Sequence, residues 1–207
     1  CGRTDAKVSA DDFALELFLN QTFETKNLLK ELNKNLPSDI KVKSVEAVGP
    51  EFNIIQSSKE KEYHYYFSSG DKSHPFNAPL IRDFGNQLDI ELMQKAAKLF
   101  EGVHNFKRYA SKPSSNTIFE REIVLSEIVV NQQIQANFTP TKSYIFKVRS
   151  KGFLRYQVRL MMGALVNIGR AEWTLDDLKE TLKNTEGLQV KHIAPSSGLV
   201  LHKVEFD

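Results

Sequence analysis

The stretch that decides the fold is KGFLRYQVRLMMGALVNIGR, residues 151–170. Four of its apolar residues recur at the spacing that places them on one face of a helix: Val158, Met162, Leu165 and Val166. Gly169 follows them, and glycine is a typical residue at the end of a helix. The spacing predicts a helix over 154–168 that buries one face in a core.

Strand patterns lie on both sides of this predicted helix. Residues 123–130 and 144–148 are rich in β-branched and aromatic side chains and are separated by the turn-like FTPTKS, and LVLHKVEF at 199–206 forms a closing strand. The aromatic run at 62–67 predicts another strand. Strands grouped with a few helices favour an α+β fold with a mainly antiparallel sheet flanked by helices.

Shorter patterns complete this reading of the chain. Helices are predicted at 29–36, at 174–182 with a cap at Thr174, and from Asp89, whose side chain caps the first turn. Alternating apolar residues predict strands at 13–19 and 40–45.

Composition restricts the class of protein. The 207 residues are 41% hydrophobic, which suits one sizeable globular body. Cys1 is the only cysteine, so an intrachain disulfide framework and a cysteine-rich zinc site are excluded, and a cytoplasmic, reducing location is expected. No apolar run reaches the roughly 18 residues of a membrane span, and the five histidines have no ligand spacing, so neither a membrane nor a metal is expected.

Charge is unevenly distributed along the sequence. Residues 128–171 contain no acidic residue but seven basic ones, whereas the formal net charge of the chain is only +2. This pattern predicts a basic face that binds a polyanion, although a solvated basic face without a partner gives the same pattern.

Asp5 and Arg159 are the first candidates for chemistry. Asp5 follows a turn-like stretch, and Arg159 lies near the start of the predicted helix, with Arg155 one turn earlier on the same face. An arginine beside a carboxylate keeps it ionised at neutral pH, as a nucleophile or general base requires. A structural salt bridge would use the same two residues, so the pair alone does not decide between the two readings.

Six blocks in a fixed order carry a family resemblance. They are GRTDA at 2–6, LNKNLPSDIKV at 32–42, KEYHYYF at 61–67, EGVHNF at 101–106, GFLRYQVRLMMGALVNIGR at 152–170 and APSSGLVL at 194–201. Together they resemble the tRNA pseudouridine synthase A (TruA) family. The first and fifth blocks are the most specific.

The resemblance implies a reaction and a fold. The uracil of a uridine in the anticodon arm of tRNA, usually at positions 38 to 40, is detached from its ribose, rotated and rejoined through carbon 5, without metal or organic cofactor. The fold implied is that of two ferredoxin-like lobes within one continuous catalytic domain. Residues 1–68 would hold the remainder of the N-terminal lobe with the catalytic loop, and residues 69–207 the C-terminal lobe with the basic RNA-binding segment. Family members are commonly homodimers, so a homodimer is expected.

The resemblance also implies roles for individual residues. Asp5 corresponds to the catalytic aspartate, Arg159 to the arginine that pairs with it, and Tyr63 to the tyrosine that stacks on the target base and assists proton transfer. Arg3 corresponds to the arginine that holds the target nucleotide out of its stack. Other residues expected to contact RNA are Thr4, Lys61, Lys151 and Arg155.

The chain departs from the family pattern at several positions. Lys7 replaces a glycine and would carry strain if that position needs a positive φ. Ile55 replaces an arginine that contacts RNA in the family. Because the family's equivalent of residues 1–10 follows a strand and a helix, the N-terminal lobe is expected to be incomplete, with an unpaired sheet edge.

Two alternatives stay open at this point. An RNA-binding relative without turnover would have the same blocks. An unrelated carboxylate-dependent hydrolase would need a second catalytic carboxylate at a defined spacing or a metal cluster, and the sequence shows neither pattern.

Overall fold

The structure is a computed structural model that describes residues 4–85 and 88–206. The chain forms two compact units, one of Cys1–Phe13 with Ser58–Asp207 and one of Ala14–Ser57. No helix among the described residues has both the length and the apolar character that crossing a membrane requires.

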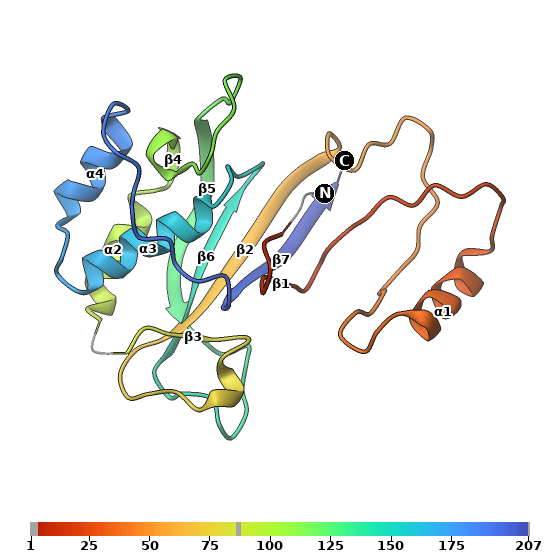
Figure 1. Cartoon of the computed structure of the whole chain (residues 1–207), viewed down its shortest axis with the longest axis horizontal. Coiled ribbons are helices and arrows are strands. Elements are labelled where there is room, and N and C mark those ends of the chain that lie inside the picture. The colour runs from red at the N-terminus through yellow and green to blue at the C-terminus, as the bar shows by residue number, and fades with distance from the viewer. Residues whose placement is uncertain (1–3, 86–87, 207) are drawn as a thin grey trace. The chain divides into compact units, whose positions relative to one another are not determined.

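The first unit is built on one mixed, mostly antiparallel sheet (Figure 1). Its seven strands are β1 (Ser9–Ala10), β2 (Ser58–Ser68), β3 (Arg82–Asp83), β4 (Gly102–Asn105), β5 (Glu120–Val130), β6 (Ser143–Ser150) and β7 (Leu199–Phe206). The order is β1-β7-β2-β6-β5-β4, and β3 pairs with β2. Among the described residues, the β1–β7 and β2–β3 pairs are parallel and the other pairs are antiparallel. The predicted α+β class and the strands at 62–67, 123–130, 144–148 and 199–206 are confirmed.

Three helices of this unit contribute to a core with one face of the sheet. They are α2 (Ile90–Lys98), α3 (Gln157–Gly169) and α4 (Leu175–Lys183), which Figure 1 shows on the same side of the strands. Two short 3-10 helices, η1 (Pro75–Asn77) and η2 (Lys107–Tyr109), lie in the connections. Twelve of the thirteen residues of α3 are buried, so this helix is the centre of the core.

The predicted caps are confirmed. The carboxylate of Asp89 accepts the backbone N–H of Leu92 at 2.9 Å at the start of α2. Thr174 forms a capping box with Asp177 at the start of α4. Both signals depend on neighbouring residues only, which is why the sequence displays them.

The start of α3 differs from the prediction. Tyr156 has φ 64°, in the left-handed region, so the helix begins at Gln157 and not near residue 154. The side chain of Gln157 accepts the backbone N–H of Leu154 at 2.8 Å and holds this turn. Arg155 therefore precedes the helix, and its predicted place one helical turn before Arg159 is wrong.

The second unit contains helix α1 (Thr25–Asn35), which confirms the helix predicted at 29–36. The strands predicted at 13–19 and 40–45 are wrong, because residues 14–57, all described, contain no strand. Leu15 and Phe18 are 69% and 85% exposed, so the apolar alternation here does not bury one face of a sheet.

The two faces of β2 have different neighbours, as the alternation of its tyrosines predicts. Tyr65 belongs to the main core and Tyr63 packs against it. Tyr66 lies in a smaller cluster with Ile81 and Val200. The face with Tyr63 and Tyr65 is thus the face that the helices cover.

Candidate active site

Asp5 lies in a turn that leads directly into the sheet. The backbone N–H of Val8 donates to the carbonyl of Asp5 at 3.1 Å, and Lys7 within this turn has φ 69°. The position where the family has glycine thus takes a positive φ in this chain, which a lysine adopts only with strain. The turn is followed by β1, whose Ser9 pairs with Val200 of β7.

Two further backbone bonds fix this segment to β7. The N–H groups of Asp11 and Asp12 donate to the carbonyl of Leu201 at 2.9 and 3.3 Å. The carboxylate of Asp12 in turn accepts the N–H of Val204 at 3.2 Å. The position of the Asp5 turn is therefore set by β7.

The structure brings Asp5 and Arg159 into contact although they are far apart in the sequence. Nη1 of Arg159 donates to Oδ2 of Asp5 at 2.7 Å, and the two side chains are 15% and 33% exposed. Nε of Arg159 donates to the carbonyl of Ala194 at 2.7 Å. Charge-assisted bonds of this length between partly buried groups fix the guanidinium and the carboxylate relative to each other.

Tyr156 supports Arg159 from another direction. Cζ of Arg159 lies 4.7 Å from the centre of the Tyr156 ring, and Cζ of Arg155 lies 5.3 Å from it. Both distances are within the range of cation–π contacts. The guanidinium groups of Arg155 and Arg159 thus both contact the ring of Tyr156, the residue with the left-handed backbone.

Tyr63 presents its ring on the same face of β2 as Tyr65. The ring packs edge-to-face on Phe153, with a centroid distance of 5.3 Å and an interplanar angle of 88°. Burial raises the pKa of Tyr63, and the negative charge of Asp5 raises it further. The phenol is therefore neutral at pH 7, and its hydroxyl group carries a proton close to a carboxylate.

A segment before β7 connects the strand and the helix that carry these side chains. Oη of Tyr65 donates to the carbonyl of Pro195 at 2.7 Å. The N–H of Ala194 donates to the carbonyl of Arg159 at 3.1 Å, so Ala194 and Arg159 exchange two bonds. Residues 194–195 thereby hold β2 and α3 in a fixed relation.

The other residues expected to contact RNA have different surroundings. Thr4 is exposed at the start of the described chain, and Lys151 and Arg155 are exposed as well. Lys61 is partly buried on β2, and burial lowers the pKa of its ammonium group. Arg3 lies outside the described residues.

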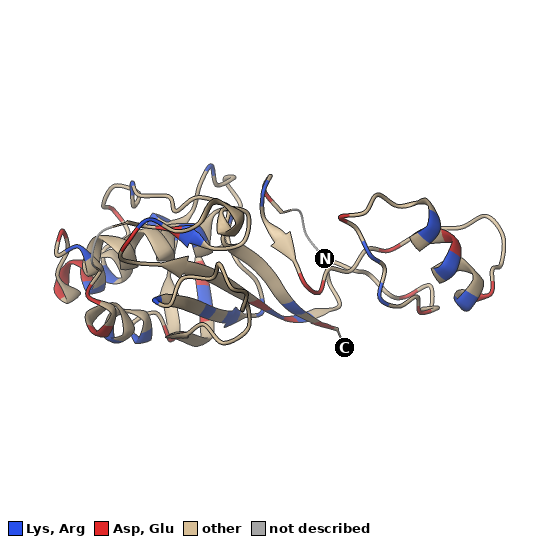
Figure 2. Cartoon of the chain, turned by 90° about the horizontal axis from the view of Figure 1, so that it is seen from below, with Lys and Arg blue, Asp and Glu red and all other residues tan. Residues whose placement is uncertain are grey.

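The seven basic residues of 128–171 do not all lie on one face of the sheet. Lys147 and Arg149 alternate along β6 with two residues of the main core, so they point away from the helices. Nε of Arg149 lies 3.4 Å from Oε2 of Glu60 in an ion pair, whereas Arg159 lies at the candidate site. The distribution of charge along the described residues can be followed in Figure 2.

Some residues of the site were not singled out from the sequence. Ala194 and Pro195 open the block at 194–201, but the sequence does not indicate that their backbone carbonyl groups hold Arg159 and Tyr65. Phe153 and Tyr156 contribute rings, and their place in the block at 152–170, beside Arg159, was the available signal.

Comparisons with known proteins identify the family. Residues 96–207, more than half of the chain, match the family described as tRNA pseudouridine synthase. The chain is also 30% identical over 206 residues to tRNA pseudouridine synthase A of Limosilactobacillus fermentum, an alignment that covers 100% of the chain and 77% of the relative. The chain belongs to the tRNA pseudouridine synthase A (TruA) family.

Two further relatives of this name show similar agreement. The protein of Fervidobacterium nodosum is 31% identical over 208 residues, covering 99% of the chain and 80% of the relative. The protein of Oceanobacillus iheyensis is 29% identical over 207 residues, covering 100% and 78%. The resemblance inferred from the six blocks is confirmed, as is the expectation of an enzyme of this family. Membership of the TruA family removes the alternative of an unrelated hydrolase.

Proposed function

We propose that this member of the TruA family converts uridine to pseudouridine in the anticodon arm of tRNA, at positions 38 to 40, with Asp5 as the nucleophile. The observation that carries the proposal is the Asp5–Arg159 ion pair beside the neutral phenol of Tyr63. These are the three side chains that the family pattern assigns to catalysis.

Asp5 supplies the nucleophilic oxygen. The bond between N1 of uracil and C1′ of ribose breaks, a bond between C5 and C1′ forms, C5 loses its proton and N1 gains one. Whether the attack is on C1′ or on the base, the reaction requires that the carboxylate of Asp5 is ionised and held in a fixed direction. The contact with Arg159 uses Oδ2, so we assign the attack to Oδ1.

Arg159 orients this carboxylate. Its guanidinium is held by the carbonyl of Ala194 and by the ring of Tyr156, so the Asp5 side chain meets a donor whose own position is fixed. A pre-oriented nucleophile lowers the entropic cost of reaching the transition state.

Tyr63 binds the flipped base and takes part in proton transfer. A base inside a stem is out of reach of a carboxylate, so the nucleotide leaves its stack and meets the ring of Tyr63. When Asp5 forms its covalent bond, the carboxylate loses the negative charge that raises the pKa of Tyr63. The phenol then becomes a stronger acid than in the free enzyme, so it can give its proton to N1 and, as the phenolate, accept the proton that leaves C5.

The remaining expected residues form the RNA contacts of the proposal. They are Arg3, Thr4, Lys61, Lys151 and Arg155, which would hold the phosphates around the flipped nucleotide. The proposal also includes a homodimer whose two subunits share one tRNA. It further includes a fold of two ferredoxin-like lobes, with the N-terminal lobe ending at residue 68. Sedimentation of the protein with and without tRNA tests the dimer.

Release of tritium tests the reaction. The protein is incubated with unmodified tRNA that carries tritium at C5 of uracil, and release into water is followed for the natural sequence, Asp5→Ala and the control Asp176→Ala, which changes an exposed carboxylate of α4. We expect release from the first and third proteins only. Release from Asp5→Ala would disprove the role of Asp5.

The same experiment decides between the two functions that remain. Binding of the labelled tRNA is measured in parallel by filter retention. Binding without release, over a full set of tRNAs, would support an RNA-binding relative without turnover in place of the enzyme.

A further inference from the structure

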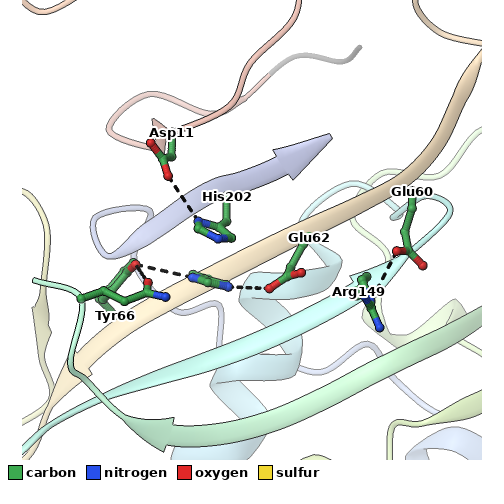
Figure 3. A network of polar contacts seen from close by, with 8 residues as sticks. Asp11, Glu60, Glu62, Tyr66, Arg149 and His202 are labelled. Carbon is green, nitrogen blue, oxygen red and sulfur yellow. Dashed lines mark hydrogen bonds and ion pairs between the residues drawn. The ribbon is translucent and has the colours of Figure 1, made fainter. Parts of the chain in front are cut away.

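A cluster of nitrogen and oxygen ligands lies on the sheet face opposite the helices (Figure 3). Glu62 and His64 come from β2 and His202 from β7, and one ligand atom from each lies within 4.8 Å of the others. This face carries Tyr66, whereas Tyr63 of the candidate active site is on the other face. The cluster is thus separate from the Asp5–Arg159 pair.

A shift in strand register brings the two histidines together. Glu62 pairs with Lys203, but the next residue, Tyr63, pairs with Leu201, so β7 has one extra residue at position 202. Such a bulge redirects the side chain of the extra residue. The His64 and His202 rings consequently stack, with a centroid distance of 3.8 Å and an interplanar angle of 16°.

The contacts of the two rings distinguish their nitrogen atoms. Nδ1 of His64 faces the hydroxyl of Tyr66 at 3.5 Å, and Nδ1 of His202 faces Oδ2 of Asp11 at 3.4 Å. Nε2 of His64 lies 2.6 Å from Oε1 of Glu62. Each Nδ1 thus has a polar neighbour outside the three-residue cluster, and Nε2 is the nitrogen that each ring offers to a ligand.

We propose that Glu62, His64 and His202 bind one zinc ion. Two imidazoles and one carboxylate are a recognised zinc donor set, in which the fourth position is taken by water. The contact of Asp11 with Nδ1 of His202 corresponds to the outer carboxylate that orients a zinc-bound histidine. Calcium and magnesium prefer oxygen ligands alone, so the two imidazoles select a transition metal.

Metal binding requires a small rearrangement of one ring. Zinc–nitrogen bonds are about 2.0–2.1 Å long and lie near the plane of each ring, so two stacked rings must tilt apart to share one ion. His64 is buried, whereas the side chain of His202 is 31% exposed and has room to turn. The exposed side of His202 also gives the ion a path from solvent.

The cluster lies on the sheet face opposite the candidate active site, so the bound ion would act on the strands and not on the uridine. The ion would join β2 to β7, and through Asp11 it would reach the segment that begins with the Asp5 turn. No metal was expected from the sequence, because its histidines lack the spacing of a local metal-binding motif. The fold supplies that proximity through strand pairing.

Calorimetry with zinc chloride tests the proposal on the untagged, chelator-treated protein. We expect saturable binding of one zinc ion per chain, and Co²⁺ in its place should give the visible absorption bands of a four-coordinate site. His202→Gln and Glu62→Gln should each weaken binding at least about tenfold, and Asp11→Asn should weaken it about 10- to 100-fold. The control His74→Gln, a histidine outside the cluster, should bind as the natural sequence does.

The variants are chosen so that a negative result is informative. His64 is fully buried, so its replacement could prevent folding, whereas His202 and Glu62 are partly exposed. Thermal unfolding without metal checks that each variant folds. Absence of saturable zinc binding, or unchanged binding in both His202→Gln and Glu62→Gln, would overturn the proposal.

Discussion

Gly163 of α3 lies directly against the backbone of His192, so that a β-carbon on Gly163 would stand 1.8 Å from the carbonyl oxygen of His192. Backbone atoms cannot give way as a flexible side chain can. This close approach allows Ala194, two residues after His192, to lie next to Arg159. The carbonyl of Ala194 accepts a hydrogen bond from Nε of Arg159. A glycine with no role in the reaction thus permits the contact that holds the guanidinium.

Gly163→Ala should therefore destabilise the protein strongly. We expect a loss of about 3 kcal/mol in the free energy of unfolding, because the backbone of residues 192–194 must move. The matched variant is Gly169→Ala in the same helix, whose new β-carbon would meet mainly the flexible side chain of Met93 and should cost about 1 kcal/mol. Urea unfolding of both variants measures the difference, and equal losses would contradict the assignment.

Tyr63→Phe should separate chemistry from packing. The ring and its contact with Phe153 remain, but the proton of the hydroxyl group is lost, so the rate of tritium release should fall about 100-fold with unchanged tRNA affinity. Tyr65→Phe is the control on the same face of β2. It removes the bond to Pro195 and should cost about 1 kcal/mol of stability without a comparable loss of rate. A Tyr63→Phe enzyme as fast as the natural one would exclude the phenol from proton transfer.

Lys7→Gly should stabilise the protein. The left-handed backbone at Lys7 costs about 1–2 kcal/mol, which glycine would not pay. Glycine has greater freedom in the unfolded chain, and this freedom cancels about 0.5–1 kcal/mol of that stabilisation. The net gain in unfolding free energy should be about 0.5–1 kcal/mol. Lys112→Gly, at φ 46° in a connection outside the Asp5 turn, should give a similar gain. Stabilisation at residue 112 without stabilisation at residue 7 would mean that the lysine contributes contacts that compensate for its backbone.

Stability should fall as the pH decreases below about 6.5, the ordinary pKa of a histidine. Burial lowers the pKa of His192 in the folded state, and the charge of Arg170 lowers it further, against an opposing effect of Glu172. In the unfolded chain the pKa of this histidine is about 6.5. Between the lowered folded-state pKa and this value, the unfolded chain binds more protons than the folded chain. The free energy of unfolding therefore rises with pH in this range and is lower at more acidic pH. His192→Gln should flatten the curve of unfolding free energy against pH.

The curve should not become completely flat in that variant. Burial lowers the pKa of His64 too, so this residue contributes a slope of the same sign. Unfolding in urea between pH 5 and 8 measures both curves. A slope identical in the two proteins would show that His192 is not protonated on unfolding in this range.

The elements predicted correctly from the sequence are those that depend on nearby residues. The apolar spacing of α3 and the caps Asp89 and Thr174 need only a few neighbours, so they could be recognised. The strands predicted at 13–19 and 40–45 were wrong because a strand forms only with a partner, and alternation alone does not supply one. The start of α3 was misplaced because the left-handed backbone at Tyr156 has no signal in the periodicity.

The site shows the same division. The family blocks pointed to Asp5, Tyr63 and Arg159, and the structure brings the first and last into contact. The carbonyl groups of Ala194 and Pro195 could not be predicted, since any residue offers a carbonyl. Charge along the sequence suggested one basic face, but the alternation of β6 sends its basic side chains away from the helices.

Residues 194–201 position both members of the ion pair. Ala194 holds Arg159, and farther along the same segment Leu201 holds the chain that follows the Asp5 turn. These contacts are made by backbone groups, but the side chains are constrained as well: Ala194 and Leu201 are buried, and a β-carbon on Gly198 would stand 2.6 Å from the carbonyl of Tyr66. The number of residues between the two anchors is not free. Insertion or deletion of one residue there would move the carboxylate and the guanidinium out of reach of each other, so evolution should conserve the length of this segment.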